Sequence, residues 1–140
     1  MGKKKLILRV DEFSENKIIV KGLISHVPEY KLVAYMNKFF ENDLLHHVKD
    51  YEFYHVHAQQ HLLFPVYANE SQKIWLFSNR TDEFFLFPEL KPFNAIALIF
   101  ESISEDWLNE LKNVSYVSLI QDIPSKFLNK IISFVDKLEE

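Results

Sequence analysis

The chain has 140 residues and a formal net charge of −4; 48% of its residues are hydrophobic, 26% are charged, and none is cysteine. This length predicts a single domain over residues 1–140 with its own core, and the composition is typical of a globular protein. The lack of cysteine excludes disulfide bonds, thiol catalysis and cysteine-ligated metal sites.

The N-terminal part of the chain predicts two extended segments and a helix. Apolar and polar side chains alternate over residues 4–10, and a β-branched run lies within residues 17–24. Pro28 suits the first turn of a helix. We expect this helix over residues 28–41, where the following side chains recur at helical spacing: Leu32, Tyr35, Met36, Phe39 and Phe40.

Aromatic residues are frequent in the middle of the chain. They occur in three short alternating runs, at residues 51–57, 62–68 and 73–78, which short polar linkers connect. Consecutive alternating runs of this kind predict a β-meander. Pro65 lies inside the second run and indicates a sheet edge or a bulge, because proline cannot donate a ladder hydrogen bond.

The C-terminal part predicts a strand, a helix, a second strand and a final helix. Residues 95–100 are apolar throughout, as in a central strand within the core. Ser104 is expected to cap the helix that follows, and alternation over residues 114–120 predicts a strand. The final helix is expected over residues 124–138, with these side chains on its buried face: Phe127, Leu128, Ile131, Val135 and Leu138.

This order of elements predicts the α+β class. We expect a mainly antiparallel sheet, formed by the meander plus a strand–helix–strand unit, with about three helices covering one face. The strand–helix–strand unit at residues 95–120 also resembles half of a ferredoxin-like unit, as in small regulatory domains that bind metabolites at dimer interfaces. That likeness is one of fold alone.

The aromatic content and the charge indicate which partners to expect. Aromatic residues make up 15% of the chain, including thirteen Phe, and a monomer does not expose that many without an interaction surface. We therefore expect a protein partner or self-association as a dimer. Nucleic acid is an unlikely partner for a chain without a basic footprint. No apolar run is long enough for a membrane span and no signal peptide is evident, so we expect a cytoplasmic protein without membrane contact.

A family resemblance appears at LFPELKPFNAIALIF, residues 86–100. This segment resembles the motif of the IPExxxVDY family of uncharacterised Bacteroidota proteins. Pro88 and Glu89 match the motif, whereas Asn94 stands at its aspartate position, and Phe87, Phe93 and Ala95 also depart from it. The remaining layout is similar too, from the Lys-rich first strand through the SHVPEYKL helix start and the LFSN end of the meander to the final strand–helix–strand unit.

The resemblance implies a small cytoplasmic protein of unknown function. The change from aspartate to Asn94 argues against a catalytic constellation at this motif. Glu89 is the best single polar position in it. We expect Pro88 to set a turn before the central strand and Glu89 to cap that turn or hydrogen-bond to it.

Five of the six histidines lie in LLHHVKDYEFYHVHAQQH, residues 44–61. If YEFYHVH forms a strand, His55 and His57 face the same side. A turn at residues 59–60 then brings His61 onto the neighbouring strand. The three imidazoles are a candidate metal site or a pH-sensitive surface. Against a metal site, no acidic residue follows Tyr54 closely enough in the sequence to support such ligands.

Other chemistries have little support. The only glycines are Gly2 and Gly22, so no glycine-rich phosphate loop exists, and no serine lies in a nucleophile elbow. We expect no cofactor and no catalytic residue. An aromatic stacking platform for RNA would use the following side chains, in a stretch that is poor in Lys and Arg: Tyr51, Phe53, Tyr54, Phe64 and Tyr67.

The sequence therefore predicts a non-enzymatic protein-interaction or regulatory protein. The first alternative is a small-ligand or metal-binding domain that uses the histidine-bearing hairpin or a pocket at a dimer interface. The second is an RNA-associated factor.

Overall fold

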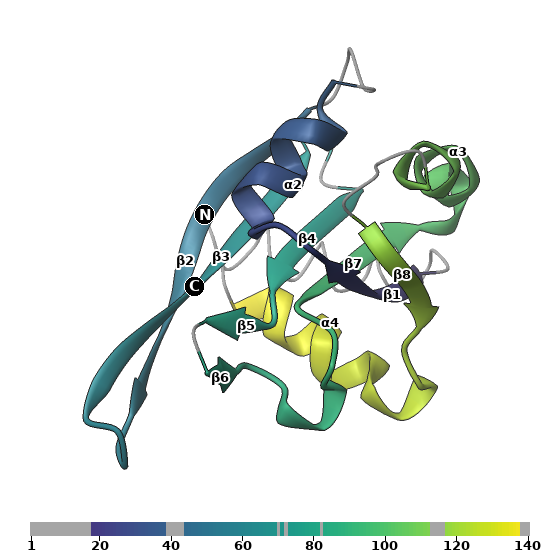
Figure 1. Ribbon diagram of the computed structural model, residues 1–140. Helices are drawn as coiled ribbons and strands as arrows, with labels where there is room; N and C mark the ends of the chain where they lie inside the picture. The colour runs from purple at the N-terminus through teal and green to yellow at the C-terminus, as the bar shows by residue number, and fades with distance from the viewer. Residues whose placement is uncertain are drawn as a thin grey trace.

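The computed structural model describes residues 18–38, 44–69, 71, 73–81, 83–112 and 117–137. Its main feature is a six-stranded sheet with the order β2-β3-β4-β7-β1-β8, in which neighbouring strands pair antiparallel (Figure 1). The predicted α+β class and antiparallel sheet are confirmed. The strands of this sheet are β1 (Ile18–Ser25), β2 (Leu45–His55), β3 (Gln60–Asn69), β4 (Ile74–Ser78), β7 (Ala95–Phe100) and β8 (Val117–Asp122).

Three α-helices in the described part of the chain pack on this sheet, as the sequence predicts. They are α2 (Glu29–Met36), α3 (Glu101–Leu111) and α4 (Leu128–Lys137). A small hairpin and two short 3₁₀ helices complete the described elements: β5 (Arg80–Thr81), β6 (Phe84–Phe85), η1 (Pro88–Leu90) and η2 (Ser125–Phe127).

The helices cover both faces of the sheet, so the expectation of one covered face is wrong. Ile131 and Val135 of α4 belong to one buried cluster, whereas α2 and α3 contribute to a second cluster on the opposite face (Figure 1). The reason lies in β7, all six residues of which are buried. Its side chains alternate between the clusters, with Ile96, Leu98 and Phe100 on the α4 face and Ala95, Ala97 and Ile99 on the other.

The predicted strand–helix–strand unit is present as β7, α3 and β8. β1 lies between the two strands and pairs antiparallel with each of them, which is a split β-α-β arrangement. The helix begins earlier than predicted, at Glu101, directly after the last residue of β7. Ser104 is therefore not the N-cap; its hydroxyl donates to the carbonyl of Glu101 (2.9 Å) inside the first turn.

The predicted meander is also present, as β2, β3 and β4. Pro65 pairs with Asp50 of β2 and lies just beyond the residues of β3 that pair with β4. Its missing N–H therefore falls where β3 has only one neighbouring strand, in keeping with the predicted edge. The strand predicted at residues 4–10 lies outside the described residues. No described helix is long and apolar enough to cross a membrane.

Candidate functional site

The histidine-bearing hairpin consists of β2, a turn at residues 56–59, and β3. β2 ends at His55, so His57 lies in the turn. The sequence pattern predicts His57 on the strand, and this prediction is wrong. Gln59 closes the turn with a positive φ of 54°. The sequence contains no glycine here, and that conformation is uncommon for other residues. This explains why the alternating pattern misplaced the end of the strand.

The three predicted imidazoles do not converge. His55 is the register partner of Gln60, whereas His61 is the partner of Tyr54, so His55 and His61 point to opposite faces of the hairpin. The rings of His55 and His57 lie 6.2 Å apart. Within the described part of the chain, no group of three or more His, Cys, Asp or Glu residues is placed to hold a metal ion.

His55 and His61 instead contact local partners of their own. Nδ1 of His55 accepts a hydrogen bond from the backbone N–H of Ala58 (3.0 Å), which helps to close the turn. The His55 ring also lies 4.7 Å from the ring of Phe84. Nδ1 of His61 lies 2.8 Å from Oε1 of Glu52 on the neighbouring strand. The side chains therefore stabilise the hairpin and its contact with the β6 segment.

Sequence reasoning missed two carboxylates beside the histidines. Glu52 contacts His61, and Oδ1 of Asp50 lies 2.8 Å from Nε2 of His47. Both carboxylates come before Tyr54 in the sequence, outside the acid-free stretch that follows it. The signal that could have revealed the first contact is the hairpin register, because residues diagonally opposite on paired strands are within reach of long side chains.

The hairpin extends beyond the end of β4. β4 pairs only with residues 66–68 of β3, but β2 pairs with β3 as far as its first residue. Residues 50–65, here called the arm, therefore project past the end of β4, toward the lower left of Figure 1. The arm is a two-stranded ribbon, a structure that is marginally stable alone.

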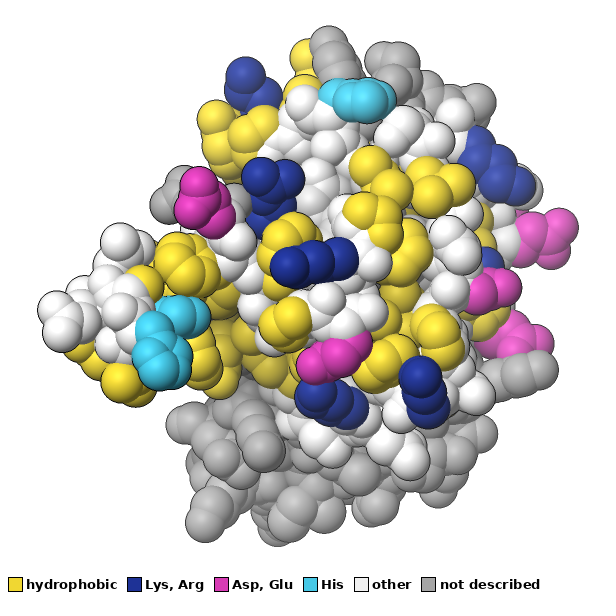
Figure 2. Space-filling model, turned by 60° about the horizontal axis from the view of Figure 1, so that its bottom comes forward, with side chains coloured by type: hydrophobic (Ala, Val, Ile, Leu, Met, Phe, Trp, Pro, Cys, Tyr) yellow, Lys and Arg dark blue, Asp and Glu magenta, His cyan; other side chains and the backbone are white. Residues whose placement is uncertain are grey.

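Apolar side chains are exposed along the arm. Of the seven large hydrophobic residues that are exposed in the described part of the chain, four belong to the arm: Phe53, Tyr54, Val56 and Leu63. Figure 2 shows hydrophobic and histidine side chains next to one another on this projection. The most exposed of the four is Val56, at 72%, in the turn at the tip.

Two hollows lie beside the arm, one on each face. The first, of about 380 Å³, is lined by Phe53, His55 and Phe64 of the arm and by the β6 segment with Phe84 and Phe85. The second, of about 450 Å³, lies between Leu63 and Pro65 of the arm, the loop before α2 and β5, and its lining includes His26, Arg80 and Thr81.

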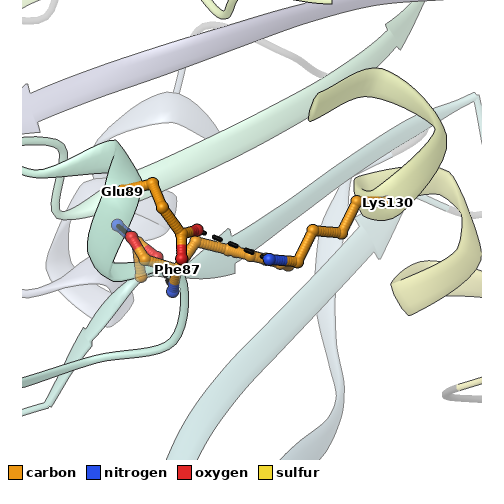
Figure 3. A network of polar contacts seen from close by, with 4 residues as sticks. Phe87, Glu89 and Lys130 are labelled. Atoms are coloured by element: carbon orange, nitrogen blue, oxygen red, sulfur yellow. Dashed lines mark hydrogen bonds and ion pairs between the residues drawn. The ribbon is translucent and has the colours of Figure 1, made fainter. Parts of the chain in front are cut away.

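The predicted family-motif residues have structural partners. Pro88 is the first residue of η1, and Glu89 lies in its first turn. Oε2 of Glu89 is 3.4 Å from Nζ of Lys130 on α4, and that ammonium also lies over the ring of Phe87 at 5.4 Å (Figure 3). Glu89 is half-exposed, so it links η1 to α4 across the surface.

Asn94 joins the beginning of β7 to the end of β1. Its Oδ1 accepts from the backbone N–H of Ser25 (2.9 Å) and its Nδ2 donates to the carbonyl of Ser25 (2.8 Å). A side chain that accepts one hydrogen bond and donates the other must be an amide here, because a carboxylate could accept from the N–H of Ser25 but could not donate to its carbonyl. This pairing gives a physical reason for asparagine at the position where the resembling family has aspartate.

Sequence reasoning also missed Asn79, which is fully buried. Its Oδ1 accepts from the backbone N–H of Phe87 (2.8 Å), and its Nδ2 donates to the carbonyls of Phe93 (2.9 Å) and Phe87 (3.4 Å). One side chain thus fixes the loop that carries the motif residues. No local pattern marks this role, since the partners lie eight and fourteen residues away.

The aromatic side chains considered as an RNA platform do not share one surface. Phe64 and Tyr67 are both buried, and their odd spacing along β3 places them on opposite faces of the sheet. Tyr51 packs against Phe134 of α4, with ring centroids 4.9 Å apart. Phe53 and Tyr54 alternate along β2 and therefore point to opposite faces.

No family model, curated protein or solved structure matches the chain.

Proposed function

We propose that this chain is a non-enzymatic protein-interaction module whose contact surface is the β2–β3 arm. The observation that carries the proposal is the concentration of exposed apolar side chains on a ribbon that projects beyond the rest of the sheet. Large exposed apolar patches mark interaction sites. Aromatic residues are also enriched at protein–protein interfaces.

The exposed side chains of the arm contribute little to the core, in contrast to Leu62 and Phe64 of the same segment, which are buried. Tyr54 and Leu63 lie on one face of the arm at 46% and 48% exposure, Phe53 lies on the other face at 43%, and Val56 occupies the tip. A partner that covers the arm would remove all four from water. A contribution of roughly 25 cal/mol per Å² of buried apolar surface would favour such a complex.

The test compares two matched double variants in affinity purification from the native cell. Tyr54→Ser with Val56→Ser removes an aromatic and an aliphatic residue from the arm. Tyr30→Ser with Leu119→Ser removes the same kinds of exposed residue from other surfaces. We expect the arm variant to lose the proteins that the wild-type chain retains, and the control variant to keep them. Equal retention by both variants would contradict the proposal.

We also propose that the chain is a divergent member of the IPExxxVDY family and acts in the cytoplasm. The family proposal is supported by Pro88 and Glu89 at the start of η1, with Asn94 following at the expected spacing. The absence of cysteine supports the location, since small secreted domains frequently depend on disulfides.

A second candidate function is small-ligand binding in the 450 Å³ hollow. Leu63 and Pro65 provide an apolar wall, while His26 and Arg80 are exposed at its margin. Apolar walls with a few polar groups are typical of small-molecule sites. This combination favours a small carboxylate with an apolar body.

Ligand-observed NMR with benzoate and short aliphatic carboxylates tests this second candidate. We expect saturable binding that weakens in Arg80→Gln and persists in Lys73→Gln, where the charge change is the same but the residue lies outside the hollow. An equal response in the two variants, or no binding of any carboxylate at millimolar concentration, would rule this function out.

A further inference from the structure

We infer that the partner of the arm is a second copy of this chain, which pairs antiparallel with the outer edge of β2 and places Phe53 at the two-fold axis. This inference rests on the proposed function of the arm and names its occupant. β2 is an edge strand, and no other described strand pairs with its outer side. Such an edge is a template for pairing with another chain.

The arm half of β2 is the half that is suited to pairing. The register between β2 and β3 shifts between His47 and Lys49, so the first half of β2 is irregular. Bulges of this kind bend an edge and hinder its pairing. From Lys49 to His55 the register is regular, and the segment from Asp50 onward projects beyond β4.

Symmetry restricts how two copies of β2 can meet. In an antiparallel pair related by a two-fold axis, one residue lies opposite itself, and its neighbours lie opposite each other in reverse order. An axis at Asp50 or Glu52 would place a carboxylate opposite its own copy. An axis at Tyr51 would place Asp50 opposite Glu52 of the second copy. Like charges directly opposite are destabilising.

An axis at Phe53 avoids these conflicts and keeps the pairing within the strand. Phe53 then faces Phe53 of the second copy, Tyr51 faces His55, and Glu52 faces Tyr54. These are aromatic pairs and a carboxylate opposite a phenol donor, which are favourable cross-strand combinations. An axis at Tyr54 also avoids the acids, but β2 ends at His55, so only residues 53–55 then pair within the strand, whereas the Phe53 axis pairs residues 51–55.

The hollow beside the arm supports the same axis. Phe53 and His55 line the 380 Å³ hollow together with Phe84 and Phe85. Because Phe53 lies at the proposed axis, the hollows of two copies meet there and form one groove, which aromatic rings line together with Glu83 and Lys91. Pairing would thus bury the exposed ring of Phe53 and cover part of this groove at the same time.

Complementary charges at the axis test the inference most directly. Phe53→Glu and Phe53→Lys each place a like charge opposite itself, so each variant alone should sediment as a monomer at concentrations where the wild-type chain sediments as a dimer. An equimolar mixture should restore the dimer, because a glutamate then faces a lysine. Leu119→Glu and Leu119→Lys, on β8, serve as controls and should dimerise like the wild-type chain.

Disulfide trapping reads the register, since the chain has no cysteine of its own. Paired residues of antiparallel strands have Cα atoms about 4.5–5.5 Å apart, within the range of about 4.4–6.8 Å that a disulfide spans. Glu52→Cys mixed with Tyr54→Cys should therefore give a cross-linked heterodimer, and each variant alone should cross-link much less. Preferential trapping of Tyr54→Cys with itself would overturn the Phe53 axis.

Failure of this inference differs from failure of the proposed function. A wild-type chain that is monomeric at all concentrations, or variants that the mixture does not rescue, would overturn self-pairing. If the arm variant Tyr54→Ser with Val56→Ser nevertheless loses a different bound protein that its control retains, the arm remains an interaction surface with another partner. If neither association exists, both proposals are wrong.

Discussion

The centre of the sheet and the arm use similar residues in opposite ways. All six residues of β7 are buried, and their side chains face two helical layers. In the arm, Phe53, Tyr54 and Leu63 are each more than two-fifths exposed. The difference lies in the neighbours: β7 has a strand on each side, whereas most of the arm has one. Apolar content alone therefore does not tell a core strand from a contact surface.

Asn79, next to the centre of the sheet, should be the polar position at which a substitution lowers stability the most. We expect Asn79→Leu, which keeps the size of the side chain, to lower the free energy of unfolding by about 4 kcal/mol. It leaves the buried N–H of Phe87 and the carbonyl of Phe93 without partners, at roughly 1–3 kcal/mol each. Chemical denaturation measures the change. Asn109→Leu, the same substitution at an exposed position of α3, should change stability by less than about 0.5 kcal/mol. Similar losses in the two variants would mean that the Asn79 contacts contribute little.

A substitution at Gly22, where β1 closely approaches Phe93, should have the next largest effect on stability. A Cβ at Gly22 would lie 2.5 Å from Cγ of Phe93, which is buried. We expect Gly22→Ala to cost about 2 kcal/mol, because overpacking of a core costs about 1–3 kcal/mol. The cost should largely disappear in a Phe93→Ala background, where the ring is absent, and a double-mutant cycle measures this coupling. An unchanged cost in that background would show that the ring is not the obstacle.

The Asn94 side chain, which links β7 to β1, should contribute less to stability than these two positions, and its contribution should depend on the amide group. Asn94→Asp removes the donor to the carbonyl of Ser25 and brings a carboxylate oxygen toward it. We expect a loss of about 1–2 kcal/mol in the free energy of unfolding at neutral pH. Asn94→Ala, which removes both hydrogen bonds without adding a charge, separates the two causes. A stability equal to the wild type in Asn94→Asp would contradict the argument for asparagine at this position.

The arm should respond differently from these positions. We expect Tyr54→Ser with Val56→Ser to lower the stability of the isolated chain by less than about 1 kcal/mol, since surface substitutions usually have small effects. Association should nevertheless be lost. Denaturation and sedimentation of the same samples test this separation of stability from binding. A large loss of stability would show that these arm side chains support the fold as core residues do, which would contradict the contrast between the arm and the centre of the sheet.

Local patterns predicted the centre well because its environment is uniform. Six consecutive apolar residues at β7 indicate a strand covered on both faces, and that is what the fold requires. The same signal implied helices on both faces, which the expectation of a single covered face overlooked. The buried side of α4 was also predictable from the sequence, since Ile131 and Val135 follow helical spacing, and both are fully buried.

The arm was less predictable because its geometry depends on the turn and on long-range pairing. The turn at residues 56–59 lacks the Gly, Asn or Asp that usually marks a hairpin, and Gln59 adopts the positive φ instead. The alternating pattern alone therefore predicts a strand as far as His57 and a convergence of His55 with His61 that the register does not allow. The roles of Asn79 and Asn94 depend on residues brought close only by the fold.

The smallest effect should come from Glu89, the most prominent polar residue of the resembling motif. Its carboxylate and the Lys130 ammonium are both about half-exposed and 3.4 Å apart. Exposed ion pairs contribute about 0–1 kcal/mol, so Glu89→Gln should reduce the free energy of unfolding by less than about 0.5 kcal/mol. Lys130→Met should show a similar loss, and the double variant should cost no more than the larger single change if the pair is the whole effect. If Glu89→Gln instead leaves stability intact but abolishes arm-dependent association, the motif would belong to the interaction surface, and the division between a structural centre and a contact-making arm would have to be redrawn.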